Sequence, residues 1–174
     1  MKVAIAYPPI LSEKGVPLLS QNRQFQWFSS PTFIYPVVPA YAATMAARSG
    51  HDVFWLDGIA ERWNEEQFFQ QAYSIHPDVM MMETKTPVVQ AHWQWINSLK
   101  RRMPETRFVL VGDHVTALPA ESFEKCEVDY VLTGGDYDFL LQNVISRIEK
   151  NAPLEPGIWY RDGSTVRNSG EFAC

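Results

Sequence analysis

The sequence is poor in cysteine, and its two cysteines lie far apart. Cys126 and Cys174 do not form a Cys-x-x-Cys pair. This pattern argues against a disulfide framework, and also against a zinc knuckle or an iron–sulfur site built from this chain alone. Such sparing use of cysteine is typical of cytoplasmic proteins, and we expect this protein to be cytoplasmic.

Long apolar runs and basic stripes are also missing. No run approaches the roughly 20 apolar residues that a membrane helix needs, and Pro8-Pro9 ends the first apolar stretch too early for a signal peptide. The net charge is -5, and basic residues gather only at Lys100-Arg101-Arg102. We therefore expect neither membrane insertion nor a nucleic-acid partner.

Several motifs of catalysis and phosphate binding do not occur. The sequence has no Gly-x-Ser-x-Gly elbow of a hydrolase and no Walker-type Gly-x-x-x-x-Gly-Lys. The pair Gly134-Gly135 follows the fifth predicted strand, so it is not the dinucleotide fingerprint that follows a first strand. These absences favour a binding role over hydrolytic chemistry.

What the sequence does contain is a repeat of apolar runs and helical patterns. The predicted strands cover residues 2–7, 52–56, 78–82, 107–111 and 128–132, and the predicted helices cover 36–49, 61–75, 87–102, 120–125 and a segment after 138. The strands alternate little, as expected when both faces of a sheet are covered. The repeat predicts an α/β fold: a flavodoxin-like (Rossmann-like) three-layer sandwich with a five-stranded parallel sheet of order 2-1-3-4-5.

Two segments depart from this repeat. Residues 10–35 lack periodicity but are rich in aromatic residues, which predicts a long lid or interface loop within an α/β domain of residues 1–150. Residues 151–174 read as a β-hairpin with Asp162-Gly163 at its turn, followed by a linker. Two strands alone are marginally stable, so the hairpin has to dock on something. The chain stops without a closing helix, which suggests a fragment that leads towards a further domain.

Four predicted loops should meet at the carboxyl edge of the sheet, where parallel α/β folds bind ligands. They span residues 7–10, 84–87, 112–116 and 133–136. Thr86 is predicted to cap the next helix, with Pro87 in its first turn. Lys85 either attracts a phosphate or carboxylate or is a solvated lysine. Gly134-Gly135 forms a tight turn that also lets backbone approach a ligand.

His114 allows two interpretations. It either ligates a metal or shuttles a proton beside Asp113, or it holds the backbone in place and contacts the edge of a ligand. We favour the second role, because the other histidines are expected on helix ends and surfaces, at no metal-site spacing. These are His51, His76 and His92.

Several short motifs, taken in order along the chain, resemble one known family. They are Tyr7-Pro8-Pro9, Gly50-His51-Asp52-Val53, Leu56-Asp57-Gly58, Pro77-Asp78-Val79, Thr84 with Thr86-Pro87, Gly112-Asp113-His114-Val115-Thr116-Ala117-Leu118-Pro119 and Val128-Asp129-Tyr130-Val131. Together they resemble the N-terminal cobalamin-binding domain of cobalamin-dependent radical S-adenosylmethionine enzymes, which include methyltransferases and the anaerobic magnesium-protoporphyrin ester cyclase. The resemblance spans roughly residues 1–168, including the hairpin at Trp159-Tyr160-Arg161-Asp162-Gly163.

The resemblance implies a cobalamin-binding module that presents base-off cobalamin, as methyl carrier or redox cofactor, to a radical domain in cis or in trans. Methionine synthase-type binders carry Asp-x-His-x-x-Gly after strand one, whereas residues 8–35 here contain no histidine, so no histidine ligand to cobalt is expected. The family's Cys-x-x-x-Cys-x-x-Cys motif is absent. The 4Fe–4S cluster and S-adenosylmethionine expected of the parent enzyme would therefore lie outside these residues.

The resemblance also suggests residues for the cofactor site, with no catalytic or metal-ligating residue among them. They are Tyr7, Pro8, Thr84, Lys85, Thr86, Gly112, Asp113, His114, Val115, Thr116, Gly134, Gly135 and Asp136. Tyr7 and Pro8 would shape the lower side, the threonines after strand three would bond corrin amides or the tail, residues 112–116 would lie along the corrin, and the glycine pair would admit the nucleotide. The family's usual Gly-Glu-Gly-Glu is replaced here by Gly134-Gly135-Asp136-Tyr137-Asp138.

Two other functions stay open at this stage. A flavodoxin-like protein binds flavin mononucleotide at the same edge, but Pro8-Pro9 supplies no amides to cradle its phosphate. A receiver-like or plain interaction domain would use a strand-end aspartate such as Asp57 or Asp113. A receiver domain also needs paired acidic residues after strand one to hold magnesium, and this sequence lacks them.

Overall fold

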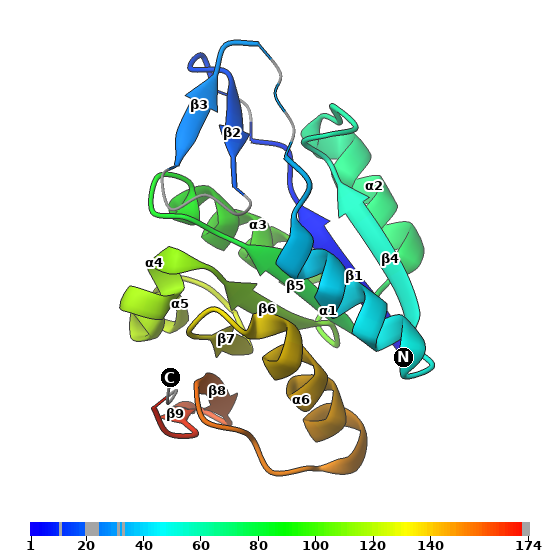
Figure 1. The fold of residues 1–174 in the computed structure, drawn as a ribbon, viewed down its shortest axis with the longest axis vertical. Helices are drawn as coiled ribbons and strands as arrows, with labels where there is room; N and C mark the ends of the chain where they lie inside the picture. The colour runs from blue at the N-terminus through cyan, green and yellow to red at the C-terminus, as the bar shows by residue number, and fades with distance from the viewer. Residues whose placement is uncertain (11, 20–24, 31, 33, 172–174) are drawn as a thin grey trace.

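A computed structural model describes residues 1–10, 12–19, 25–30, 32 and 34–171. Its main feature is a seven-stranded sheet in the order β4-β1-β5-β6-β7-β8-β9 (Figure 1). The strands are β1 (Lys2–Tyr7), β4 (Asp52–Asp57), β5 (Val79–Glu83), β6 (Arg107–Val111), β7 (Tyr130–Leu132), β8 (Ile158–Asp162) and β9 (Thr165–Asn168).

The first five of these strands are parallel, and their order is the predicted 2-1-3-4-5. The predicted C-terminal hairpin also forms, and it docks by pairing β8 antiparallel with β7. The sheet is therefore larger than the five strands expected. The fifth strand is shorter than predicted, because β7 begins at Tyr130 rather than at residue 128.

Helices cover both faces of the sheet, as a three-layer sandwich requires (Figure 1). One face packs against α1 (Val37–Arg48) and α6 (Tyr137–Lys150). The other packs against α2 (Glu65–Ile75), α3 (Val89–Arg102) and α5 (Pro119–Lys125). No helix among the described residues is long and apolar enough to span a membrane.

The two cores share the central strand β5. Met80 and Met82 point into the core under α2 and α3, while Met81 points into the core under α1 and α6. All three side chains are at most 1% exposed. The methionine run is therefore core on both faces of the sheet, because successive side chains of a strand alternate between faces.

The predicted lid, residues 10–35, contains a small antiparallel hairpin of β2 (Val16–Leu18) and β3 (Gln26–Phe28). The lid or interface loop was predicted without these two strands being noticed, because three-residue strands are too short to show a period of two. Residues 11, 20–24, 31 and 33 of this segment lie outside the described residues. Figure 1 shows the hairpin standing at the end towards which β1 and β4 point.

Two local predictions at the carboxyl edge were also wrong. The segment after β6 is not a loop but a short helix, α4 (Asp113–Ala117), whose N-cap is Gly112. Helix α3 begins at Val89 with Val88 as its N-cap, so Thr86 does not cap it, and Pro87 lies in the preceding turn. The hydroxyl of Thr86 bonds elsewhere, to a histidine described below.

Candidate cofactor site

The carboxyl ends of β5 and β6 lie in direct backbone contact. The amide of Thr84 donates to the carbonyl of Val111 at 2.8 Å. Gly112 has a φ of +114°, and a Cβ at this position would lie only 2.2 Å from the carbonyl oxygen of Thr84. Glycine is required here on both counts, because the conformation is left-handed and the space is already taken. The two loops therefore form one unit.

Thr84 faces inward. It is 0% exposed, and its hydroxyl lies 2.7 Å from Nδ1 of His92 on α3. His92 was predicted at a helix end or surface, and this was wrong, since it is also 0% exposed. Burial lowers its pKa from 6.5 to about 4, so the ring is neutral. Its position three residues after Val89, on the apolar face of α3, was the sequence signal for burial.

His114 is held at both ring nitrogens. Its Nδ1 lies 3.1 Å from the hydroxyl of Thr86, and its Nε2 lies 3.1 Å from a carboxylate oxygen of Glu121. The ring also meets Trp93 edge-on, with 5.9 Å between centroids. Within the described part of the chain, no group of three or more His, Cys, Asp or Glu side chains is placed to hold a metal ion. The contacts of His114 thus link two loops to α5.

Lys85 and Asp113 join the same two loops by an ion pair. Their Nζ and Oδ2 atoms are 2.6 Å apart. The lysine side chain is 8% exposed, whereas the aspartate side chain is 69% exposed. Lys85 is thus not the solvated lysine that sequence alone allowed. Its charge is placed at the edge of the sheet beside an accessible carboxylate.

Thr116 connects α4 to the turn after β7. Its hydroxyl donates to the carbonyl of Gly112 at 2.9 Å and accepts from the amide of Gly134 at 3.2 Å. Gly135 is exposed, and a Cβ built there would meet nothing within 4 Å. Asp136 is exposed at the N-cap of α6. This turn therefore presents backbone and small polar groups to open space.

A buried acid, Glu83, was missed by sequence reasoning. It is the last residue of β5 and is 4% exposed, and the hydroxyl of Tyr7 donates to its Oε2 at 2.8 Å. Burial raises the pKa of Glu83 to about 7, although hydrogen bonds from Tyr7 and Tyr137 and the charge of Lys85 act in the opposite direction. Burial also raises the pKa of both tyrosines above its usual value. The sequence signal for this buried acid was an acidic residue at the end of an otherwise apolar strand.

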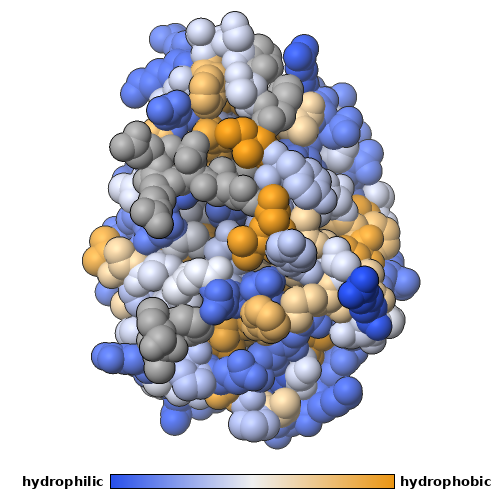
Figure 2. Space-filling view, in the orientation of Figure 1, coloured by the Kyte–Doolittle hydropathy of each residue, from blue (hydrophilic) through white to orange (hydrophobic). Residues whose placement is uncertain are grey.

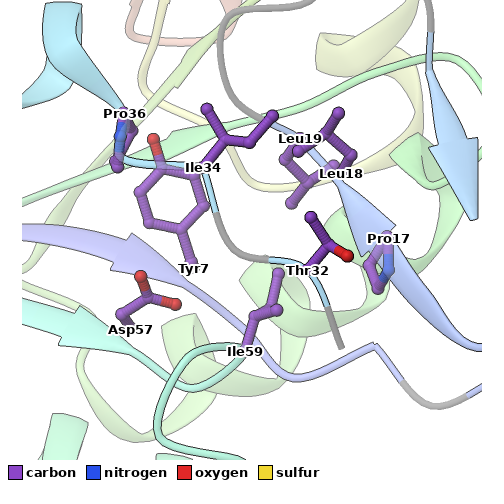
Figure 3. Close-up of a pocket in the computed structure, with 9 residues that line it drawn as sticks. All are labelled: Tyr7, Pro17, Leu18, Leu19, Thr32, Ile34, Pro36, Asp57 and Ile59. Carbon is purple, nitrogen blue, oxygen red and sulfur yellow. The ribbon is translucent and has the colours of Figure 1, made fainter. Parts of the chain in front are cut away.

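A small pocket opens beside Tyr7, under the β2–β3 hairpin. Its volume is about 40 Å³. Figure 3 shows Tyr7 and Asp57, from the neighbouring strands β1 and β4, on one side of it and Leu18 and Leu19 on the other. Burial raises the pKa of Asp57. The pocket is large enough for water-sized groups and too small for a large cofactor.

Apolar surface is available around the carboxyl edge. Of the large hydrophobic residues that are exposed, most lie just before or at the start of α1, in the first turn of α6 or between α4 and α5. They are Ile34, Tyr35, Val37, Leu118 and Phe139, and of these Tyr35, Leu118 and Phe139 are more than half exposed. On the side of the molecule that Figure 2 shows, apolar residues are interspersed with hydrophilic ones rather than forming one continuous patch.

The structure divides the predicted site residues into two groups. Seven are buried: Tyr7, Pro8, Thr84, Lys85, Gly112, His114 and Val115. Six are exposed or half-exposed: Thr86, Asp113, Thr116, Gly134, Gly135 and Asp136. The contacts described above bring the loops after β5, β6 and β7 together, and Tyr7 joins them through Glu83.

Comparisons with known proteins agree with this architecture. The family described as the B12 binding domain matches residues 29–139, more than half of the chain. A search of curated proteins found no match.

Solved structures show the same fold. A radical S-adenosylmethionine methyltransferase, TsrM from Kitasatospora setae, with cobalamin and an iron–sulfur cluster bound, superposes with a TM-score of 0.68 at 16% identity over 99% of this chain and 29% of that one. TsrM with tryptophan substrate and a SAM analog gives a TM-score of 0.71 at 16% identity over 97% of this chain and 30% of that one. The chain thus spans less than a third of their length. On the family match, the chain belongs to the B12-binding domain family.

Proposed function

We propose that this chain binds cobalamin at the carboxyl edge of β1, β5, β6 and β7 and presents it, base-off, to a radical S-adenosylmethionine domain in cis or in trans. The observation that carries the proposal is the match of the B12-binding family over residues 29–139, which include three of the four edge loops. The fold shared with TsrM, a radical S-adenosylmethionine methyltransferase solved with cobalamin and an iron–sulfur cluster bound, supports the radical context.

The edge suits a corrin. A corrin has broad apolar faces and a rim of amide side chains, so it needs a flat, partly apolar surface with hydrogen-bonding groups at its border. Exposed Leu118 and Phe139 supply apolar surface. Gly135, with nothing within 4 Å of its Cβ position, leaves room for a large group to approach the backbone.

The exposed members of the site would make the direct contacts. Thr86, Thr116 and the backbone of Gly134-Gly135 offer hydroxyls and amides to the corrin rim or the nucleotide tail. The buried members act indirectly, because Lys85, Gly112 and His114 fix the loops that carry these groups. When bound, cobalamin would supply a cobalt centre that carries a methyl group or changes oxidation state.

The positions of the histidines support binding without a histidine on cobalt. Both ring nitrogens of His114 are engaged, and His92 is fully buried. His51 lies beside the amino terminus and Glu149, and His76 caps the end of α2, both at the opposite edge of the sheet. Every histidine of the chain is thus either engaged or away from the proposed site.

The proposal is tested by mixing purified protein with hydroxocobalamin and separating the complex by gel filtration. We expect cobalamin to co-elute with the protein and to show a base-off absorption spectrum. A base-on spectrum would contradict the base-off arrangement alone, and colourless folded protein would contradict cobalamin binding altogether.

A matched pair of variants tests the location of the site. Gly135→Leu places a side chain in the open space at the turn, and we expect it to fold normally but to lose cobalamin. Gln71→Leu places the same side chain at an exposed position of α2 and should bind like the parent protein. Equal binding by both variants would move the site away from the β7 turn.

A further inference from the structure

Glu83 occupies the centre of the proposed cofactor site without a role in the contacts assigned above. It ends β5, which lies between β1 and β6 in the sheet. Its side chain is almost fully enclosed, at 4% exposure. Burying a charge is costly unless it is compensated. The charge state of a carboxyl buried beneath the loops that would carry the cofactor therefore needs an explanation.

Two phenols and one cation act on the carboxyl of Glu83. Tyr7 of β1 donates its hydroxyl to Oε2 at 2.8 Å, and Tyr137 of α6 also hydrogen-bonds to the carboxyl group. Both tyrosines are buried, at 3% and 8% exposure. Glu83 therefore sits in a small polar cluster on the face of the sheet that α1 and α6 cover.

The charges near Glu83 act in opposite directions. Lys85 favours the carboxylate and Asp113 disfavours it, and these two are themselves paired at 2.6 Å. The remaining ionisable neighbours of the cluster are Asp57 of β4 and Asp138 of α6, which face the two tyrosines. Desolvation is the largest effect on Glu83, and it raises the pKa of the carboxyl to about 7.

We propose that Glu83 binds a proton at the floor of the cofactor site and that cobalamin binding is coupled to uptake of this proton. The coupling rests on the proposed function. A corrin lying over the edge loops removes water from above Glu83, and this disfavours the carboxylate further. By linkage, cobalamin binds more tightly to the protonated protein, and its affinity falls as the pH rises above 7. Glu83 is thus a positioning residue that acts through Tyr7 and Lys85.

The test measures the affinity for methylcobalamin by equilibrium dialysis between about pH 6 and pH 9, a range in which the ligand itself does not titrate. The affinity of the parent protein should fall across this range, by about tenfold for each unit by which binding raises the pKa of Glu83. Calorimetry in two buffers of different ionisation enthalpy should show net proton uptake near neutral pH. Glu83→Gln, which mimics the protonated acid, should bind with little dependence on pH.

Two further variants separate this coupling from a merely structural role. Tyr7→Phe removes a hydrogen bond that stabilises the carboxylate, so the midpoint of the pH profile should move to higher pH. Asp57→Asn removes a half-buried carboxyl at the same edge, and its profile should match that of the parent protein. An unchanged profile in Glu83→Gln, or a shift in Asp57→Asn alone, would overturn the inference.

Infrared spectroscopy of the ligand-free protein tests the proton itself. The parent protein should show a carboxylic acid band at pH 6 that is lost above pH 8, and Glu83→Gln should lack this band. If Glu83→Gln fails to fold, a shift of the band in Tyr7→Phe assigns it to Glu83. Absence of the band in the parent protein would overturn the inference whatever the ligand does. Absence of methylcobalamin binding at every pH would instead overturn the proposed function, and the coupling with it.

Discussion

At the scale of the residue, two glycines of the site differ in what they tolerate. Gly112 has a φ of +114° and no room for a Cβ, whereas Gly135 has open space around it. We predict that Gly112→Ala lowers the free energy of unfolding by about 2 kcal/mol or more, because strain and a backbone clash act together. Gly135→Ala should change it by no more than about 0.5 kcal/mol. Urea denaturation measures both, and equal losses would contradict the close approach of the two loops.

His92 makes the stability of the protein depend on pH. Its pKa is about 4 in the folded protein and 6.5 when unperturbed, so the unfolded chain takes up the proton more readily. The stabilisation is complete above pH 6.5 and is lost as the pH falls towards 4. Between pH 7 and pH 4 the parent protein should lose about 3 kcal/mol more than His92→Asn, in which the amide can replace Nδ1 towards Thr84. Parallel pH profiles of unfolding would contradict this prediction.

The sequence predicted which loops meet at the carboxyl edge, but it did not predict the side chains buried beneath them. Strand-end loops such as that of Lys85 can be placed from the order of strands alone, since the carboxyl ends of parallel strands share an edge. Glu83 and His92 were missed because their environment depends on side chains more than seven positions away, from β1, α6 and the loop after β5. Periodicity shows which face a residue occupies and does not show which partner meets it there.

At the scale of the element, the C-terminal hairpin pairs with β7 and is further anchored by one arginine. Arg161 of β8 donates to the carbonyls of Phe123, Cys126 and Val128 at 2.6, 2.9 and 2.9 Å. We predict that Arg161→Met lowers the free energy of unfolding by about 2–3 kcal/mol, because charged donors to backbone carbonyls are lost. Arg167→Met removes only an exposed ion pair with Asp162 and should cost less than about 1 kcal/mol. Similar losses in the two variants would contradict the anchoring role.

Elements were predictable where the chain is long and regular. The five parallel strands are apolar over five or six residues or are flanked by clear helices, and the order of the strands follows from right-handed crossovers. Helix α4 and strands β2 and β3 were missed, because three to five residues give too little periodicity. The start of α3 was misplaced because Thr86 uses its hydroxyl for His114 rather than for a cap. Tertiary contacts therefore override local propensity mainly at the carboxyl edge.

At the scale of the whole molecule, the two ends of the strands carry different kinds of connection. The carboxyl edge carries the linked loops after β5, β6 and β7, while the opposite edge carries short connections such as Gly50-His51 and His76-Pro77. The loops are joined to one another by an ion pair and by side-chain hydrogen bonds. A ligand that touches several of them therefore stabilises the loops as one unit.

This arrangement predicts how cobalamin changes the stability of the protein. At a free concentration 100-fold above its dissociation constant, a ligand that binds only the folded state adds about 2.7 kcal/mol to the free energy of unfolding. We expect the melting temperature to rise with cobalamin concentration. Hydrogen exchange through local opening should slow at residues 84–87, 112–116 and 133–136, and much less at Gly50-His51 and His76, which lie at the far edge. If protection appeared first at the far edge, the cofactor would have to bind on another face of the sheet, and the loops after β5, β6 and β7 would have a purely structural role.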